Sequence, residues 1–180
     1  MALNVLKKLH NVIDSMVKHV GQFIAWFTLL MVLVMTIIVV LRHGFDIGWI
    51  AMQESVVYMH ALVFMLGAAY TLNHDEHVRV DIFYQKFTVK TRAWIDLIGT
   101  VVILLPVCVF IFVYSFDYVM ASWHILEGSG EAGGLPWVYL LKSLLLVMPV
   151  LLGLQGISGG IKNILVIKGE PVVTDKGEQA

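Results

Sequence analysis

Residues 20–41 read VGQFIAWFTLLMVLVMTIIVVL, an uninterrupted apolar run without a charged side chain. A membrane-spanning helix needs about 20 predominantly apolar residues to cross a hydrocarbon core of about 30 Å, and this run has that length. It is followed by Arg42 and His43 rather than by the small residues of a signal-peptide cleavage site. We therefore expect the run to remain in the mature protein as its first span.

Three further uncharged runs, residues 55–72, 97–116 and 143–161, have similar lengths. The chain of 180 residues is 59% hydrophobic and 14% charged, whereas soluble domains carry roughly 25% charged residues. These values predict an all-α polytopic membrane protein with four transmembrane helices in a single domain, residues 1–168, followed by a polar tail, residues 169–180. A chain of this length leaves no room for a second, soluble catalytic domain.

Two amphipathic segments accompany the spans. In residues 2–19, apolar side chains recur at spacings of three and four, and lysines lie on the remaining face. This helix either lies in the membrane interface or a partner's groove, or it extends the first span out of the bilayer. Residues 79–92 repeat the pattern and predict a short surface helix between spans two and three.

The lysines and arginines set the expected orientation. Ten of the twelve lie in the termini and the middle loop, and only Arg42 and Lys142 lie on the other side. Because positive residues in short loops stay on the cytoplasmic side, both termini are predicted to be cytoplasmic. The loops around residues 46–53 and 122–136 then face outward. The sequence EGSGEAGG at residues 127–134 predicts a flexible, acidic outer loop.

Composition also excludes several classes of function. None of the four spans has an Asp, Glu, Lys or Arg in its interior, which argues against a proton relay and against an antiporter that uses a buried glutamate. A net charge of −1 gives no basic field for nucleic acid. Cys108 is the single cysteine and cannot pair within the chain. No serine lies in a recognisable nucleophile turn, so we expect no enzyme activity.

Cofactor and metal sites are not expected either. Only His60 lies inside a span, so a pair of histidines for haem is missing within the helices, and we interpret His60 as a hydrogen-bonded packing residue. Residues 74–81 contain side chains suited to zinc or iron, namely His74, Asp75, Glu76, His77 and Asp81. A charged loop leaving the membrane is usually solvated. A metal site would also need a further ligand, and the sequence does not indicate one.

Small residues in the spans favour close helix packing. Gly156 and Gly160 form a GxxxG pair in span four, and residues 67–69 read GAA in span two. Whether the approaching helix belongs to this chain or to a partner is left open. Pro106 and Pro149 lie inside spans three and four and should kink them. Together these features predict a passive membrane protein that assists another.

Three stretches resemble a known family. They are LRHGFDIGWIAMQES at residues 41–55, VFMLGAAYTLNHDEHVRVDIFY at residues 63–84 and GLPWVYLLKSLLLVMPVLLGLQG at residues 134–156. Their order and spacing are similar to those of the small membrane subunit of TRAP (tripartite ATP-independent periplasmic) transporters. The resemblance covers the membrane core up to Gly160.

This resemblance implies a role without catalysis. The chain would scaffold the large permease subunit of a sodium-coupled transporter in the bacterial inner membrane, to which a periplasmic solute-binding protein delivers a small organic acid. Its partners would be that large subunit, the binding protein and membrane lipid. It would bind no nucleic acid and no cofactor. The alternatives are a membrane-anchor subunit of a redox enzyme complex and a free-standing structural membrane protein.

The resemblance also suggests residues that matter for assembly. Arg42, Trp49 and Glu54 would orient spans one and two on the outer side, with Arg42 and Glu54 paired. A second group would fix the cytoplasmic helix, and its members are His77, Arg79 and Asp81.

Overall fold

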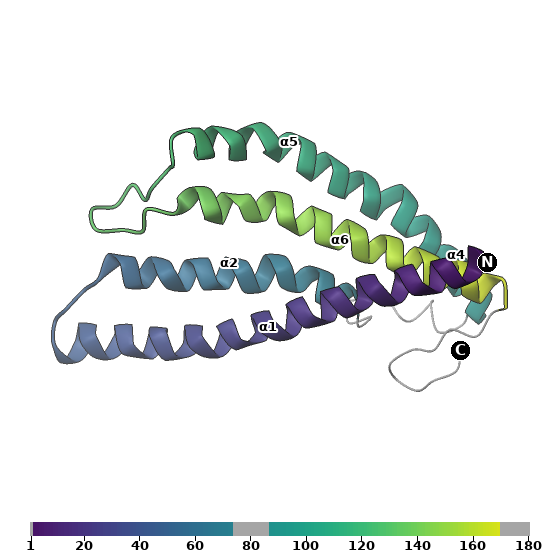
Figure 1. The fold of residues 1–180 in the computed structure, drawn as a ribbon. Helices are drawn as coiled ribbons and strands as arrows, with labels where there is room; N and C mark the ends of the chain where they lie inside the picture. Colours follow the sequence, from purple (N-terminus) through teal and green to yellow (C-terminus); the bar gives the residue numbers. More distant parts are fainter. Residues whose placement is uncertain (1, 74–86, 170–180) are drawn as a thin grey trace.

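The computed structural model describes residues 2–73 and 87–169, and within these ranges the chain is helical without a strand (Figure 1). The helices are α1 (Ala2–Gly44), α2 (Ile50–Asn73), α4 (Val89–Gly99), the π-helix η1 (Thr100–Leu104), α5 (Leu105–His124) and α6 (Val138–Ile167). Helices α4, η1 and α5 follow one another without a break. The described residues thus form four helical rods long and apolar enough to cross a membrane, which confirms the predicted fold class.

The four rods lie side by side, with α6 between the others (Figure 1). Helix α6 packs against α1 and α2 on one side and against α4 and α5 on the other, while α1 also packs against α2. The connections at residues 45–49 and 125–137 lie at one end of the rods, which we call the loop end. The start of α1 and the end of α6 lie at the opposite end, which we call the terminal end.

Helix α1 joins the first amphipathic segment to the first span without interruption. Of the two arrangements considered for residues 2–19, the structure has the continuous extension. The inner face of this extension is covered by the same chain, because Ile13 and Val17 pack against Ala69 of α2. Farther along the helix, Gly21 is buried against the ring and Cβ atom of Tyr70. One side of this extension is therefore an intramolecular packing surface, while Val5, Leu9 and Met16 of the apolar stripe remain exposed.

The third rod starts at a side-chain cap and contains one irregular turn. Thr88 precedes α4 and its hydroxyl accepts a hydrogen bond from the backbone N–H of Thr91 at 3.3 Å. At η1 the N–H of Leu105 reaches back to the carbonyl of Thr100, five residues earlier, directly before Pro106. Such π-bulges occur where the ordinary hydrogen-bond ladder is interrupted. The predicted surface helix at residues 79–92 is described only from residue 87 onward, and residues 89–92 belong to α4.

The glycines of α6 face the third rod. A Cβ atom at position 156 would lie 2.5 Å from Leu104 Cδ2, and one at position 160 would lie 3.5 Å from Leu97 Cδ1. The absence of side chains at Gly156 and Gly160 therefore lets α4 and η1 approach α6 closely. This answers the question that the GxxxG pair left open, since the approaching helix belongs to the same chain.

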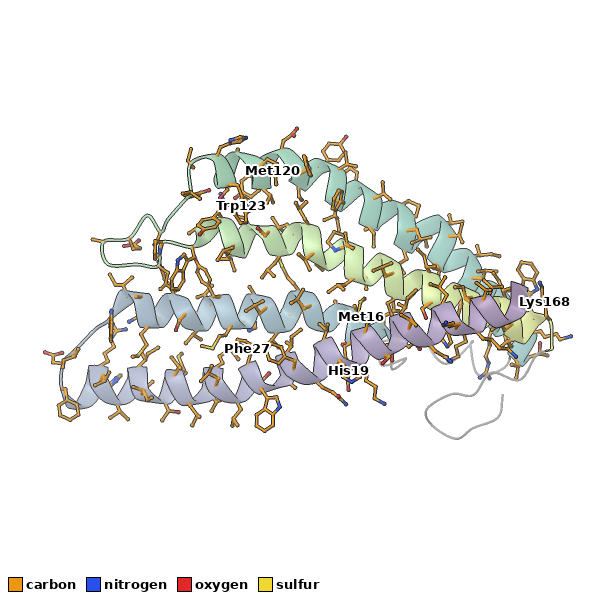
Figure 2. All side chains as sticks on the ribbon, in the orientation of Figure 1. Met16, His19, Phe27, Met120, Trp123 and Lys168 are labelled. Atoms are coloured by element: carbon orange, nitrogen blue, oxygen red, sulfur yellow. The ribbon has the colours of Figure 1, made fainter. Side chains whose placement is uncertain are left out.

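Most of the apolar surface stays uncovered within the chain. In the most apolar stretches of α1, α2 and the α4–α5 rod, 6%, 11% and 6% of the residues are buried, against 28% in α6. Figure 2 shows side chains projecting away from the neighbouring helices along the outer sides of α1 and α5. A lipid bilayer or another membrane protein must cover these surfaces, because they are too apolar to face water.

Candidate functional site

A cluster of four polar side chains joins the first half of α1 to α6. Its members are His10 and Asp14 of α1 and Gln155 and Ser158 of α6, and we call it the α1–α6 polar cluster. Ser158 Oγ donates to Asp14 Oδ1 at 2.5 Å, and Gln155 Nε2 donates to the same oxygen at 3.2 Å. His10 Nδ1 lies 2.7 Å from Ser158 Oγ. Ser158 is fully buried, and His10 and Gln155 are also buried.

The hydroxyl proton of Ser158 decides which groups donate and which accept hydrogen bonds in this cluster. A hydroxyl has one proton, and its contact with Asp14 uses that proton, so the Ser158 oxygen is left to accept from His10, which selects the imidazole tautomer with an N–H at Nδ1. A serine nucleophile would instead give its proton to a histidine and would be reachable by substrate. The cluster therefore contains the residue types of a serine hydrolase, but its serine donates to the aspartate instead of the histidine. The burial of the serine also keeps a substrate from reaching it. The geometry of the cluster suits fastening α1 to α6 by buried hydrogen bonds.

A second set of polar contacts fastens the loop end. Glu54, in the first turns of α2, accepts a hydrogen bond from Ser129 Oγ and another from the backbone N–H of Leu135 at 2.6 Å. Gly134 lies against both side chains, and a Cβ atom there would be 2.8 Å from Glu54 Oε1. One carboxylate thus holds the connection between α5 and α6 onto α2. The prediction of a flexible loop missed these contacts, in which Gly134 makes room for Glu54 and Ser129.

The same loop is anchored at its start by an ion pair. Lys142 Nζ donates to Glu127 Oε2 at 2.5 Å and lies 4.1 Å from the centre of the Tyr118 ring. The hydrogen bond from Lys142 holds the pKa of Glu127 below its usual value. Trp123 Nε1 donates to Ser143 Oγ at 2.8 Å, which adds a further contact between α5 and α6 (Figure 2).

The residues expected at the outer side are not grouped as the resemblance suggested. Arg42 lies exposed in the last turn of α1, and Trp49 lies exposed just before α2. Within the described ranges Arg42 and Glu54 form no ion pair; both Glu54 oxygens bind the loop instead. The expected Arg42–Glu54 pair is therefore wrong, although all three residues lie at the loop end. The second group, His77, Arg79 and Asp81, lies outside the described residues.

His60 differs from its interpretation as a hydrogen-bonded packing residue. It is exposed near the middle of α2, and its recorded contact is stacking on Phe64, with ring centres 6.3 Å apart. Over residues 2–73 and 87–169, no group of three or more His, Cys, Asp or Glu side chains is placed to hold a metal ion. The metal-type residues at positions 74–81 lie outside these ranges.

Sequence reasoning missed the α1–α6 polar cluster, although a signal for it was present. His10 and Asp14 are four residues apart, a spacing that places both on one side of the helix and lets them face the same neighbouring helix. Gln155 and Ser158 alternate with the glycines of span four. Polar residues on a packing face of a helix need partners. The contact between the polar residues of α1 and those of α6 depends on how the two helices cross, and no local sequence pattern predicts that crossing.

The described residues define a multi-pass membrane protein in which polar groups fasten helices and a loop together. A family model described as "Tripartite ATP-independent periplasmic transporters, DctQ component" matches residues 31–163. This match covers most of the chain, and the protein belongs to that family of small TRAP transporter components. Comparison with curated proteins and with solved structures finds no match.

Proposed function

We propose that the protein scaffolds the large permease subunit of a sodium-coupled, binding-protein-dependent TRAP transporter that imports a small organic acid. The observation that carries this proposal is the low burial of three of the four spanning rods within the chain. Polar groups that could move a solute or an ion are instead used to fix α1 to α6 and the loop to α2. A rigid frame with uncovered apolar sides suits a brace for another membrane protein.

The proposed setting is the bacterial inner membrane with both termini in the cytoplasm. The terminal end then faces the cytoplasm, in agreement with the lysines of residues 7–18 and 162–176. The loop end faces the periplasm, where the solute-binding protein would approach. The domain of residues 1–168 would be the membrane frame, and residues 169–180 its polar tail.

Within this frame the expected residues have distinct proposed roles. Glu54 would keep the periplasmic loop in place, while Arg42 and Trp49 would anchor the ends of α1 and α2 at the membrane surface. Gly156 and Gly160 support the close packing of the third rod. A group on the cytoplasmic side, His77, Arg79 and Asp81, would fix the helix after α2.

Copurification tests the proposal directly. The tagged chain is expressed with its chromosomal neighbours, extracted in mild detergent, and its bound proteins are identified by mass spectrometry. We expect a large polytopic membrane protein, and deletion of the small subunit should abolish sodium-dependent uptake of the solute. Recovery of a flavin or iron–sulfur subunit, or a Soret band in the purified complex, would instead identify a redox anchor. Recovery of the chain alone would contradict the proposal.

The residue roles need their own variants. Arg42→Ala and Asp81→Ala should each lower the amount of assembled complex and the uptake rate. Unchanged assembly and uptake in both variants would refute the roles assigned to these residues, without affecting the proposed function.

A further inference from the structure

The outer side of α5 carries an acidic residue among apolar ones. Phe110, Val113, Tyr114 and Asp117 follow one another at helical spacing, and all four are exposed. The buried residues of α5, Cys108, Val119 and Ser122, lie on the opposite side, toward α6. We call the exposed stripe the Asp117 face. It has no covering helix within the described part of the chain.

The position of Asp117 relative to Trp123 gives its expected depth in the membrane. Asp117 precedes Trp123 by six residues, which corresponds to about 9 Å along an α-helix. Tryptophan rings concentrate at the level of the lipid headgroups, so Asp117 is placed in the outer part of the hydrocarbon. Its short side chain cannot reach water over that distance. A carboxylate facing lipid at this depth is unfavourable, and such residues normally pair with another polar group.

The described part of the chain supplies no such partner. Among residues 2–73 and 87–169, Asp117 has neither a hydrogen bond nor an ion pair. Lys142 lies on the neighbouring helix, but its ammonium group binds Glu127 and covers the Tyr118 ring. The described residues therefore supply no counter-charge for Asp117.

We propose that the Asp117 face is the docking surface for a transmembrane helix of the large membrane subunit, and that a lysine or arginine of that helix pairs with Asp117. This inference rests on the proposed function. The exposed Tyr114 ring, one turn away and 4.4 Å from the ring centre of Phe110, offers an aromatic surface for the same cation. A second copy of this chain fits poorly, because a symmetric pairing of this face would bring two Asp117 carboxylates together.

Substitution of Asp117 tests the pairing in the complete complex. The large subunit is copurified with tagged wild type, Asp117→Asn, Asp117→Lys and Asp117→Glu chains. We expect the Asn variant to reduce the recovered large subunit about tenfold, the change that ~1.4 kcal/mol produces. The Lys variant should abolish recovery, and the Glu variant should restore most of it. Glu131→Gln is the matched control, since it removes an exposed acid in the loop after α5.

Crosslinking from the same face identifies the occupant independently of affinity. In a Cys108→Ser background, Val113→Cys is labelled with a photoactivatable maleimide, and Val39→Cys on the exposed side of α1 serves as the control. We expect an adduct with the large subunit from position 113 and none from position 39. An adduct between two copies of this chain would overturn the assigned occupant.

The outcomes separate the two proposals. In one outcome the Asn and Lys variants recover as much large subunit as wild type does, and position 113 gives no adduct. The docking face is then wrong, while the proposed function stands. If wild type recovers no large subunit, both are wrong. Each variant should melt within the error of wild type as an isolated chain, because Asp117 makes no hydrogen bond or ion pair with the residues that the structure describes.

Discussion

Gly21 is the position at which the packing of α1 on α2 can be tested most sharply. An added Cβ atom would overlap the Tyr70 ring and would lie 2.8 Å from Tyr70 Cβ, whereas ordinary contacts begin near 3.4 Å. The ring can turn away, but Tyr70 Cβ is fixed to the backbone of α2. Gly21→Ala must therefore push the two helices apart by several tenths of an ångström.

The expected loss of stability follows from two opposing effects. Overpacking of this kind costs about 1–3 kcal/mol, and replacing a helical glycine by alanine returns about 1 kcal/mol. Because the overlap includes Tyr70 Cβ, which cannot turn away, the upper part of the overpacking range applies, about 2–3 kcal/mol, and the net destabilisation is about 1–2 kcal/mol. For a chain of this size, each kcal/mol shifts the melting temperature by about 2–4 °C. We expect Gly21→Ala to melt about 2–8 °C below wild type in detergent.

Gly67→Ala is the matched control. Gly67 is also a glycine inside a spanning helix, but a Cβ atom there would meet no atom within 4 Å. This variant should melt at or slightly above the wild-type temperature, since only the helix preference changes.

A double-mutant cycle with Tyr70→Gly, which removes both the ring and the Cβ atom, assigns the effect to the proposed contact. Tyr70→Gly should cost much less in the Gly21→Ala background than in wild type, because it removes the overlap that the alanine creates. The reasoning is refuted if Gly21→Ala melts at the same temperature as wild type. It is also refuted if the destabilisations caused by the two substitutions add to within about 0.5 kcal/mol.

The remaining predictions concern the polar contacts. Ser158→Ala leaves the imidazole and carboxylate of α1 without their bridging hydroxyl and should destabilise the chain by about 1 kcal/mol in thermal melts. Glu54→Ala removes the acceptor of the Leu135 N–H and should speed hydrogen exchange at that amide. Because Lys142 lowers the pKa of Glu127 in the folded chain, this ion pair stabilises above the usual glutamate pKa and is lost as the pH falls below about 4.5. Glu127→Gln should therefore flatten the acid side of the pH–stability profile.

Each of these predictions has a control. Ser143→Ala is the matched change for Ser158, because its hydroxyl is only partly buried and should cost less. Glu131→Ala removes an exposed carboxylate of the same loop and should leave exchange at residue 135 unchanged. Equal exchange in wild type and Glu54→Ala would contradict the loop anchor. Identical acid profiles for wild type and Glu127→Gln would contradict the role of the ion pair.

The sequence predicted the spans well because their signal is local. A run such as residues 20–41 is apolar over the length of a bilayer, and this property needs no knowledge of its neighbours. The helices extend beyond the predicted runs, since α6 continues to Ile167 and α1 begins at Ala2. Hydropathy detects where lipid begins and ends, whereas hydrogen bonds along the backbone continue the helix past that point.

The candidate site was harder to predict because it depends on contacts between distant residues. Glu54 was singled out from the resemblance, but its partners are residues 129 and 135, about 80 positions later. The loop sequence alone indicated flexibility. Asp117 was passed over because the predicted span ended one residue before it, while the helix continues to His124.

By itself, the amino-acid sequence determined that this protein is a four-span, all-α membrane protein, because hydrophobic length and the spacing of apolar residues act within single segments. Only the tertiary structure decided that α6 lies between the other rods, that Gly156 faces the third rod, and that His10 and Asp14 meet Ser158. It also decided that Asp117 has no hydrogen bond or ion pair with residues 2–73 and 87–169. These features arise from how helices cross, and a crossing joins residues that no sequence period relates.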